Sequence, residues 1–203
     1  MAMSIDPRLL QLASPTLPVG AYSYSGGLEA AIEAGIVHDA ASAQRWIGDV
    51  LEHSVLRMEA PLLARMIDEP DERWNEMLLA SRETAELRAE TVQMGASLNR
   101  LLRDLGVDPC EYEEPSYPAV YAQAVRAWGI ARDDALTAYL WAWLENQVIA
   151  AVKAVPLGQT DGQRMLLFLS RNFSMESDLG NFTPGLAILS SRHETQYSRL
   201  FRS

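Results

Sequence analysis

The sequence has few of the residues that build covalent cross-links or metal sites. Cys110 is its one cysteine among 203 residues, which excludes an intramolecular disulfide and favours a reducing cytoplasm. Its three histidines, His38, His53 and His193, are far apart, and no Cys-x-x-Cys, His-x-x-x-His or Asp-rich loop accompanies them. We therefore expect no metal site and no cofactor in this chain.

Positive charge is also scarce. The formal net charge is −10 and the pI is about 4.8. Nucleic acids and anionic membranes are bound through clustered Lys and Arg, so both are excluded as expected partners, and proteins or cations are favoured. Residues 171–203 carry a net charge of +1, so the C-terminal segment is less acidic than the body and suited to an acidic surface.

Long apolar runs are absent too. No stretch approaches 18 uninterrupted apolar residues, and no charged-then-apolar leader opens the chain. We expect a soluble, cytoplasmic protein.

The sequence contains many helical patterns and no convincing alternating strand. Asp6-Pro7 is typical of a helix start, and Asp39, Asp133 and Thr160 are further expected caps. Residues 81–105 have the clearest apolar spacing, interrupted by Gly95, which predicts a close helix crossing. Pro61 is expected either to kink a helix or to start one, and a long apolar stripe predicts a central helix over 133–155. We predict an all-α, single-domain bundle of roughly eight to ten helices over 1–203, with loop-like functional segments at both ends.

Catalytic motifs are missing. The glycine-bearing turns 24–27 and 158–163 lack the Lys-Ser/Thr of a nucleotide loop, and Ser23 and Ser25 are not in a Gly-x-Ser-x-Gly elbow. The charged residues of 82–90 are interpreted as an ordinary helix surface. We predict a non-enzyme with no catalytic residue. The alternative is an all-α enzyme or small-ligand binder with a pocket between helices.

The two ends of the chain are the segments whose composition favours function. Residues 9–29 combine two prolines, several glycines and a pair of tyrosines, Tyr22 and Tyr24, in a turn region before Glu29. The nine residues before Ser203 include Tyr197, Leu200 and Phe201 together with Arg199 and Arg202. We expect this tail, about 190–203, to be ordered by its own domain, a second copy or a partner.

Four blocks of sequence resemble the UreF-type urease accessory proteins. They are Leu9 to Glu29; Glu86 to Glu90 with Met94-Gly95, Ser97 and Leu98; Ala151 to Gln163; and His193 to Phe201. They occur in the order of that family and span nearly the whole chain. Together they are far more specific than any one of them alone.

The resemblance implies an all-α, homodimeric, non-catalytic component of a nickel-delivery complex. Its implied partners are a UreD/UreH-type accessory protein, a UreG-type GTPase whose GTP hydrolysis it regulates or scaffolds, and the urease apoprotein. In that family the tail becomes ordered against the UreD/UreH-type partner. The resemblance favours Tyr22 and Arg199 for complex assembly, and Glu29 and Lys153 for the GTPase-facing surface. The complete set of predicted partner-binding residues is Tyr22, Tyr24, Glu29, Lys153, Tyr197, Arg199, Leu200, Phe201 and Arg202.

Overall fold

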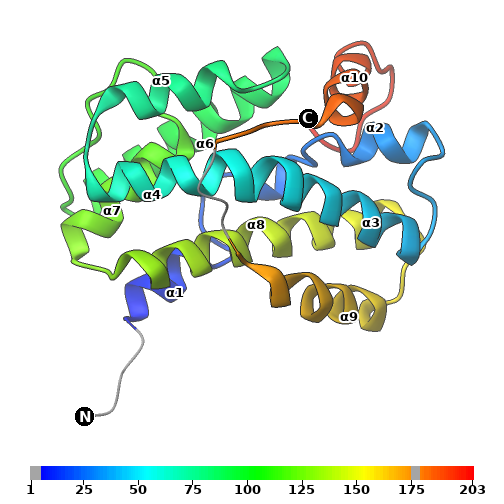
Figure 1. The fold of residues 1–203 in the computed structure, drawn as a ribbon, viewed down its shortest axis with the longest axis horizontal. Coiled ribbons are helices and arrows are strands. Elements are labelled where there is room, and N and C mark those ends of the chain that lie inside the picture. Colours follow the sequence, from blue (N-terminus) through cyan, green and yellow to red (C-terminus); the bar gives the residue numbers. More distant parts are fainter. Residues whose placement is uncertain (1–5, 175–178) are drawn as a thin grey trace.

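The chain folds into helices joined by turns and by longer loops (Figure 1). The computed structural model describes residues 6–174 and 179–203; the predicted domain 1–203 also includes 1–5 and 175–178, which lie outside this description. No strand occurs in the described ranges, which confirms the all-α prediction. The helical segments are α1 (Pro7–Leu12), η1 (Ala21–Ser23), α2 (Leu28–Glu33), α3 (Ala40–Val50), η2 (Leu51–Glu59), α4 (Ala60–Asp68), α5 (Glu72–Ala80), α6 (Ala85–Asp104), α7 (Tyr117–Trp128), α8 (Arg132–Ala154), α9 (Gln159–Leu169), η3 (Ser170–Asn172) and α10 (Pro184–His193).

Helix α8 is central, as its apolar stripe predicts. Its first half, with Leu136 and Tyr139, packs into a core shared with α1, α4, α6 and α7. Its second half, with Leu144 and Val148, packs into another core shared with α2, α3, η2 and α9. One helix therefore contributes to both cores, and burial of these apolar side chains is the main force that holds the bundle together. No helix within the described ranges is both long and apolar enough to cross a bilayer.

The helix around Pro61 continues instead of ending. Residues Leu51–Glu59 form a π-helical stretch between α3 and α4, and Pro61 lies in the first turn of α4. In an α-helical register, residue 61 would donate its N–H to the carbonyl of Arg57, but proline has no N–H. The backbone N–H of Gly180 donates to that carbonyl instead, at 3.0 Å. Gly180, in the segment before α10, thus supplies the donor that Pro61 lacks.

Several predicted helix starts are confirmed and others are wrong. Asp6 caps α1, and Asp39 forms a reciprocal capping box with Ser42. Asp133 does not cap α8, which starts one residue earlier and so places this carboxylate inside the first turn, where the helix dipole favours it. Thr160 likewise lies inside α9, which begins after Gly158 without a side-chain cap.

Gly95 marks the close crossing that the sequence predicts. A Cβ atom added there would lie 2.1 Å from the carbonyl oxygen of Pro115 and 2.9 Å from the backbone nitrogen of Tyr117. These are backbone atoms at the start of α7, so they cannot move aside as a flexible side chain would. Glycine at this position lets α6 and α7 pack against each other, despite its cost in helix propensity.

We expect Gly95→Ala to lower the free energy of unfolding by roughly 1–3 kcal/mol, because the added methyl group overpacks the α6–α7 contact. Urea unfolding followed by circular dichroism measures this change. Gly185→Ala in α10 is the matched control, because a Cβ there meets no atom within 4 Å. Equal stability of the two variants would contradict the packing explanation.

Candidate functional site

The last residues of the chain contact the segment that precedes α2. We call residues 194–203 the tail and residues 9–29 the N-terminal segment. The backbone N–H of Arg202 donates to the carbonyl of Ser23 at 2.7 Å, and the N–H of Ser25 donates to the carbonyl of Ser203 at 3.0 Å. The tail ends between α2 and α6 (Figure 1). The two segments that composition singled out therefore form one site.

Glycines shape the N-terminal segment for this contact. Gly20, Gly26 and Gly27 all have left-handed backbone conformations, with φ of 80°, 57° and 81°. Glycine is the residue that adopts this conformation without steric cost. At Gly27 a Cβ would also lie 2.5 Å from the Cδ1 atom of Leu186. The segment can thus turn sharply into α2 while α10 packs directly on it.

Glu29 is the anchor for the tail. Its side chain is buried in the first turn of α2. Oε1 accepts the backbone N–H of Leu200 at 2.6 Å, and Oε2 accepts that of Phe201 at 2.8 Å. Each carboxylate oxygen therefore binds one tail amide, an arrangement that compensates for the desolvation of the charge.

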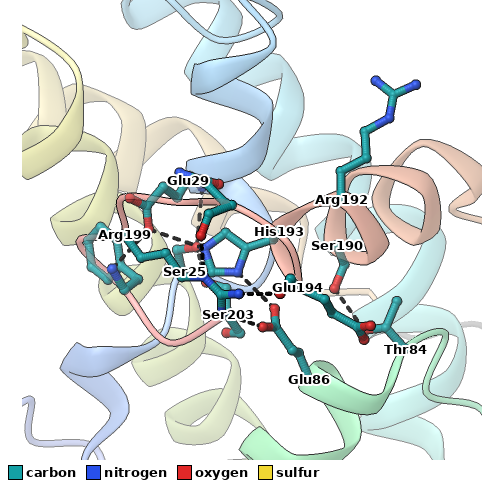
Figure 2. Close-up of polar contacts among 12 residues, drawn as sticks. Ser25, Glu29, Thr84, Glu86, Ser190, Arg192, His193, Glu194, Arg199 and Ser203 are labelled. Carbon is teal, nitrogen blue, oxygen red and sulfur yellow. Dashed lines mark hydrogen bonds and ion pairs between the residues drawn. The ribbon is translucent and has the colours of Figure 1, made fainter.

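His193 and Arg199 complete an ionic cluster around this anchor (Figure 2). The imidazole of His193 is fully buried, with Nε2 3.3 Å from Glu29 Oε2 and Nδ1 2.8 Å from Glu86 Oε2. The other oxygen of Glu86 accepts Nη1 of Arg199 at 2.6 Å, and Arg199 also donates to the carbonyl of Glu194. The cluster joins α2, α6, α10 and the tail.

Beyond this cluster, alternating tail side chains point in different directions. Phe201 is buried and belongs to the core beside α2 and α9. Leu200 is 74% exposed, and Tyr197 is fully exposed. The tail is therefore fixed by its backbone and by Phe201, while two large apolar side chains remain on the surface.

The tail also contacts Glu90, which lines a cavity of mixed apolar and charged side chains. Ser203 Oγ donates to Glu90 Oε2 at 2.6 Å, and burial raises the pKa of Glu90 to about 7. The cavity, about 110 Å³, is lined by Glu90 and by Glu59, Arg82 and Tyr139. Glu59 pairs with Arg82 and accepts the Tyr139 hydroxyl at 2.5 Å. Glu59 is thus engaged by both groups, whereas the buried Nε of Arg82 has no hydrogen-bond partner among the described residues.

The charged residues of 82–90 were interpreted as an ordinary helix surface, and for three of them this interpretation is wrong. Arg82 faces the cavity, Glu86 holds His193 and Arg199, and Glu90 meets Ser203. Glu86 and Glu90 are four residues apart in α6 and so share one face of that helix, whereas Arg82 precedes its N-cap, Thr84. That spacing is the sequence signal for a common contact, but it does not show what the face contacts. His193 was missed as a cluster member because its partners are more than 100 residues away.

The predicted partner-binding residues divide into buried and exposed sets. Tyr24 is buried, and its hydroxyl donates to Gln93 Oε1 at 2.7 Å; like Glu29 and Phe201, it supports the site from inside. Tyr22 is 65% exposed and lines an open groove with Arg202. Lys153 lies exposed in the last turn of α8, outside the ionic cluster.

The described part of the chain has no group of three His, Cys, Asp or Glu side chains placed to hold a metal ion. In His193 both ring nitrogens already face carboxylates. The cluster is thus organised to bind the tail.

Comparison with known proteins identifies the family. The UreF family model matches residues 37–170. A urease accessory protein UreF from Azoarcus sp. is 57% identical, covering 97% of this chain and 94% of the relative. The chain belongs to the UreF family. The UreF of Dechloromonas aromatica is 52% identical, covering 97% of this chain and 96% of the relative. A bifunctional urease accessory protein UreEF from Bordetella bronchiseptica is 46% identical over 96% of this chain, which matches 51% of that longer protein.

The family match confirms the resemblance noted in the sequence and gives the chain its general role, that of a urease accessory protein. The model match covers the helical body from the start of α3 to the end of α9. The relatives cover nearly the whole chain, so the assignment rests on more than the body alone.

We expect Glu29→Gln to loosen the tail, because an amide has one oxygen and leaves one of the two tail N–H groups facing an NH₂ group. An unsatisfied buried donor costs about 1–3 kcal/mol, so hydrogen exchange at Leu200 and Phe201 should accelerate roughly tenfold to a hundredfold. Mass spectrometry of tail peptides measures this exchange. Glu33→Gln, an exposed position at the end of α2, is the matched control. Unchanged tail exchange in Glu29→Gln would contradict the anchoring role.

We expect Glu90 to make the protein less stable as the pH rises from 4.5 to about 7. Its pKa is raised in the folded state, so in this window the folded chain holds a proton that the unfolded chain has lost. In this window Glu90 raises the equilibrium constant for unfolding by up to tenfold for each unit that the pH rises. The contribution of Glu90 is measured by urea unfolding of the wild type and of Glu90→Gln at pH 5 and pH 8. Glu111→Gln, at an exposed position, is the control. A constant stability difference between wild type and Glu90→Gln would refute this.

Proposed function

We propose that this chain is a non-catalytic assembly factor whose tail and N-terminal segment together form a docking surface. Its partners are a UreD/UreH-type accessory protein and a UreG-type GTPase, and the complex delivers nickel to the urease apoprotein. Nickel is the cargo of the complex. The chain acts in the cytoplasm as a homodimer, and Lys153 belongs to the surface that faces the GTPase.

The observation that carries this proposal is the tail itself. Glu29 and the ionic cluster fix its backbone, while Tyr197, Leu200 and Arg202 remain exposed, and Arg202 lines a groove with the exposed Tyr22. Aromatic and arginine side chains are the usual anchors of protein interfaces. A surface held in place before binding loses less conformational entropy when a partner arrives. The geometry therefore favours recognition by a protein.

Arg199 supports an assembly role over direct activation of GTP hydrolysis. An activating arginine must reach the transferring phosphate with its guanidinium. Here that guanidinium is already engaged by Glu86 and by the carbonyl of Glu194. Removing Arg199 should therefore loosen the tail and, through it, the complex. Any influence on GTP hydrolysis would follow from how the GTPase is held.

We expect Arg199→Ala to weaken formation of the three-component complex by roughly tenfold or more, because it breaks a charge-assisted contact of about 1.5–3 kcal/mol that fixes the tail. Size-exclusion chromatography with the UreD/UreH-type protein and the GTPase measures assembly. GTP turnover by the assembled fraction is measured in parallel. Arg164→Ala on the exposed face of α9 is the matched control.

The two readouts distinguish the alternatives. Weaker assembly with normal turnover in the remaining complex supports the scaffold. Full assembly with slow turnover would overturn it in favour of a GTPase activator. If wild type forms no complex with either partner, the proposed function fails altogether.

A further inference from the structure

The cavity beside Glu90 is lined by polar side chains that are largely withdrawn from solvent. Those that are at most 7% exposed come from three helical segments: Ser54 and Glu59 on η2, Thr91 on α6, and Tyr139 and Gln147 on α8. A water molecule needs roughly 10–15 Å³ of space of this kind. At about 110 Å³, the cavity has room for a small organic molecule or for a group of waters.

One wall of the cavity is formed by an unusual helix. Val50, Ser54, Val55 and Glu59 line it, and the last three belong to the π-helical stretch η2. π-helical turns are rare and are frequently found at functional sites. The backbone irregularity and the cavity therefore occur in the same place.

Several polar groups at the cavity have no partner within the chain. The buried Nε of Arg82 has none among the described residues. Neither the amide of Gln147 nor the hydroxyl of Ser54, both in buried residues, forms a hydrogen bond with the described residues. Buried polar groups in folded proteins are nearly always hydrogen-bonded. An occupant of the cavity is therefore expected to supply the missing partners.

The unpartnered groups define what this occupant must carry. The Nε–H of Arg82 requires an acceptor. The amide of Gln147 has one oxygen that accepts and one NH₂ group that donates. A carbonyl oxygen together with an N–H donor, both on one small molecule, complements these groups.

The charges around the cavity favour an uncharged occupant. Arg82 is already paired with Glu59. Burial raises the pKa of Glu90 to about 7, so at pH 7 this carboxyl is protonated in about half of the molecules. An ion in the cavity would lose its hydration without gaining a free opposite charge, and this loss is costly.

We propose that the cavity binds a small uncharged molecule with a C(=O)–NH₂ group. Its carbonyl oxygen accepts the Nε–H of Arg82, and its NH₂ group donates to the side-chain oxygen of Gln147. The site lies inside the helical body and is separate from the docking surface, so it does not rest on the proposed function. It is tested with the full-length chain alone.

Three probes of nearly equal size test this chemistry: acetamide, acetone and acetate, each with four heavy atoms. Methyl-¹³C-methionine labelling gives eight signals, and Met94→Leu assigns the one from the cavity wall. We expect acetamide to shift the Met94 signal saturably, with a dissociation constant on the order of 1–10 mM. Nuclear Overhauser effects between the acetamide and Met94 methyl groups should place the probe in the cavity. The exposed Met77 is the reference signal.

Acetone and acetate should bind roughly tenfold more weakly at pH 7. Acetone keeps the carbonyl but has no N–H to donate, and acetate introduces a charge. Tighter binding of acetate would show an anion site at Arg82 and overturn the proposal. Equal binding of acetone would show that the cavity is filled for its shape alone, which also overturns it.

A variant tests the contact with Gln147. Gln147→Leu removes the amide at similar side-chain size, so the affinity for acetamide should fall roughly fivefold or more. Gln163→Leu, the same change at an exposed position of α9, is the matched control and should keep the wild-type affinity. An unchanged affinity in Gln147→Leu would refute the assigned contact.

The probe comparison in the wild type remains decisive if Gln147→Leu fails to fold. No saturable shift of Met94 with acetamide, or a shift without a nuclear Overhauser effect to its methyl group, would leave ordered water alone in the cavity and overturn the proposal. Failure of the complex with the accessory protein and the GTPase would remove the proposed function and leave the cavity site standing.

Discussion

The buried carboxylate of Glu29 is the contact on which the site depends. It is buried under the tail, so its charge must be compensated by groups of the tail and of α10. Two backbone amides and the imidazole of His193 do this. The dependence is mutual, because the tail amides would otherwise lack an acceptor and the carboxylate would lose its donors. A buried charge of this kind is costly when unpaired, which makes the docked arrangement specific as well as stable.

The segment before α10 is also held against the helical body, by hydrogen bonds to carbonyl groups of the helix that contains Pro61. Pro61 removes a donor from a continuous helix, and Gly180 restores one to the carbonyl of Arg57. Phe182 donates to the carbonyl of His53 in the same π-helical stretch. The helix that has lost a regular hydrogen bond is thus completed by residues just before α10. This brings α10, and with it His193, against α2 and α6, where the ionic cluster forms.

Local patterns predicted the fold well and the site only in part. Apolar spacing, caps and glycines identified nearly every helix, because these signals act within a few residues. The crossing at Gly95 was predicted for the same reason. The cap positions at Asp133 and Thr160 were wrong because an acidic or hydroxyl side chain is also acceptable inside a first turn.

The site resisted prediction because its partners are distant in sequence. Composition singled out both chain ends, and the family resemblance added Glu29 and Arg199. Neither could show that Glu86 faces His193, a pair separated by 107 positions. A charged residue on a helix is solvated more often than it is buried, so the surface interpretation of Glu86 and Glu90 was the reasonable one until packing was known.

The arrangement of charge explains how an acidic chain without catalytic motifs can have so ordered a site. At the wall of the cavity, Glu59 pairs with Arg82 and accepts the Tyr139 hydroxyl. At the surface, exposed side chains of the tail lie on a backbone that the interior holds in place. Polar contacts in the interior therefore fix the backbone of the tail, and this backbone sets the positions of the exposed side chains. Such a division fits the proposed docking role, because the polar contacts of the interior hold the shape of the exposed surface.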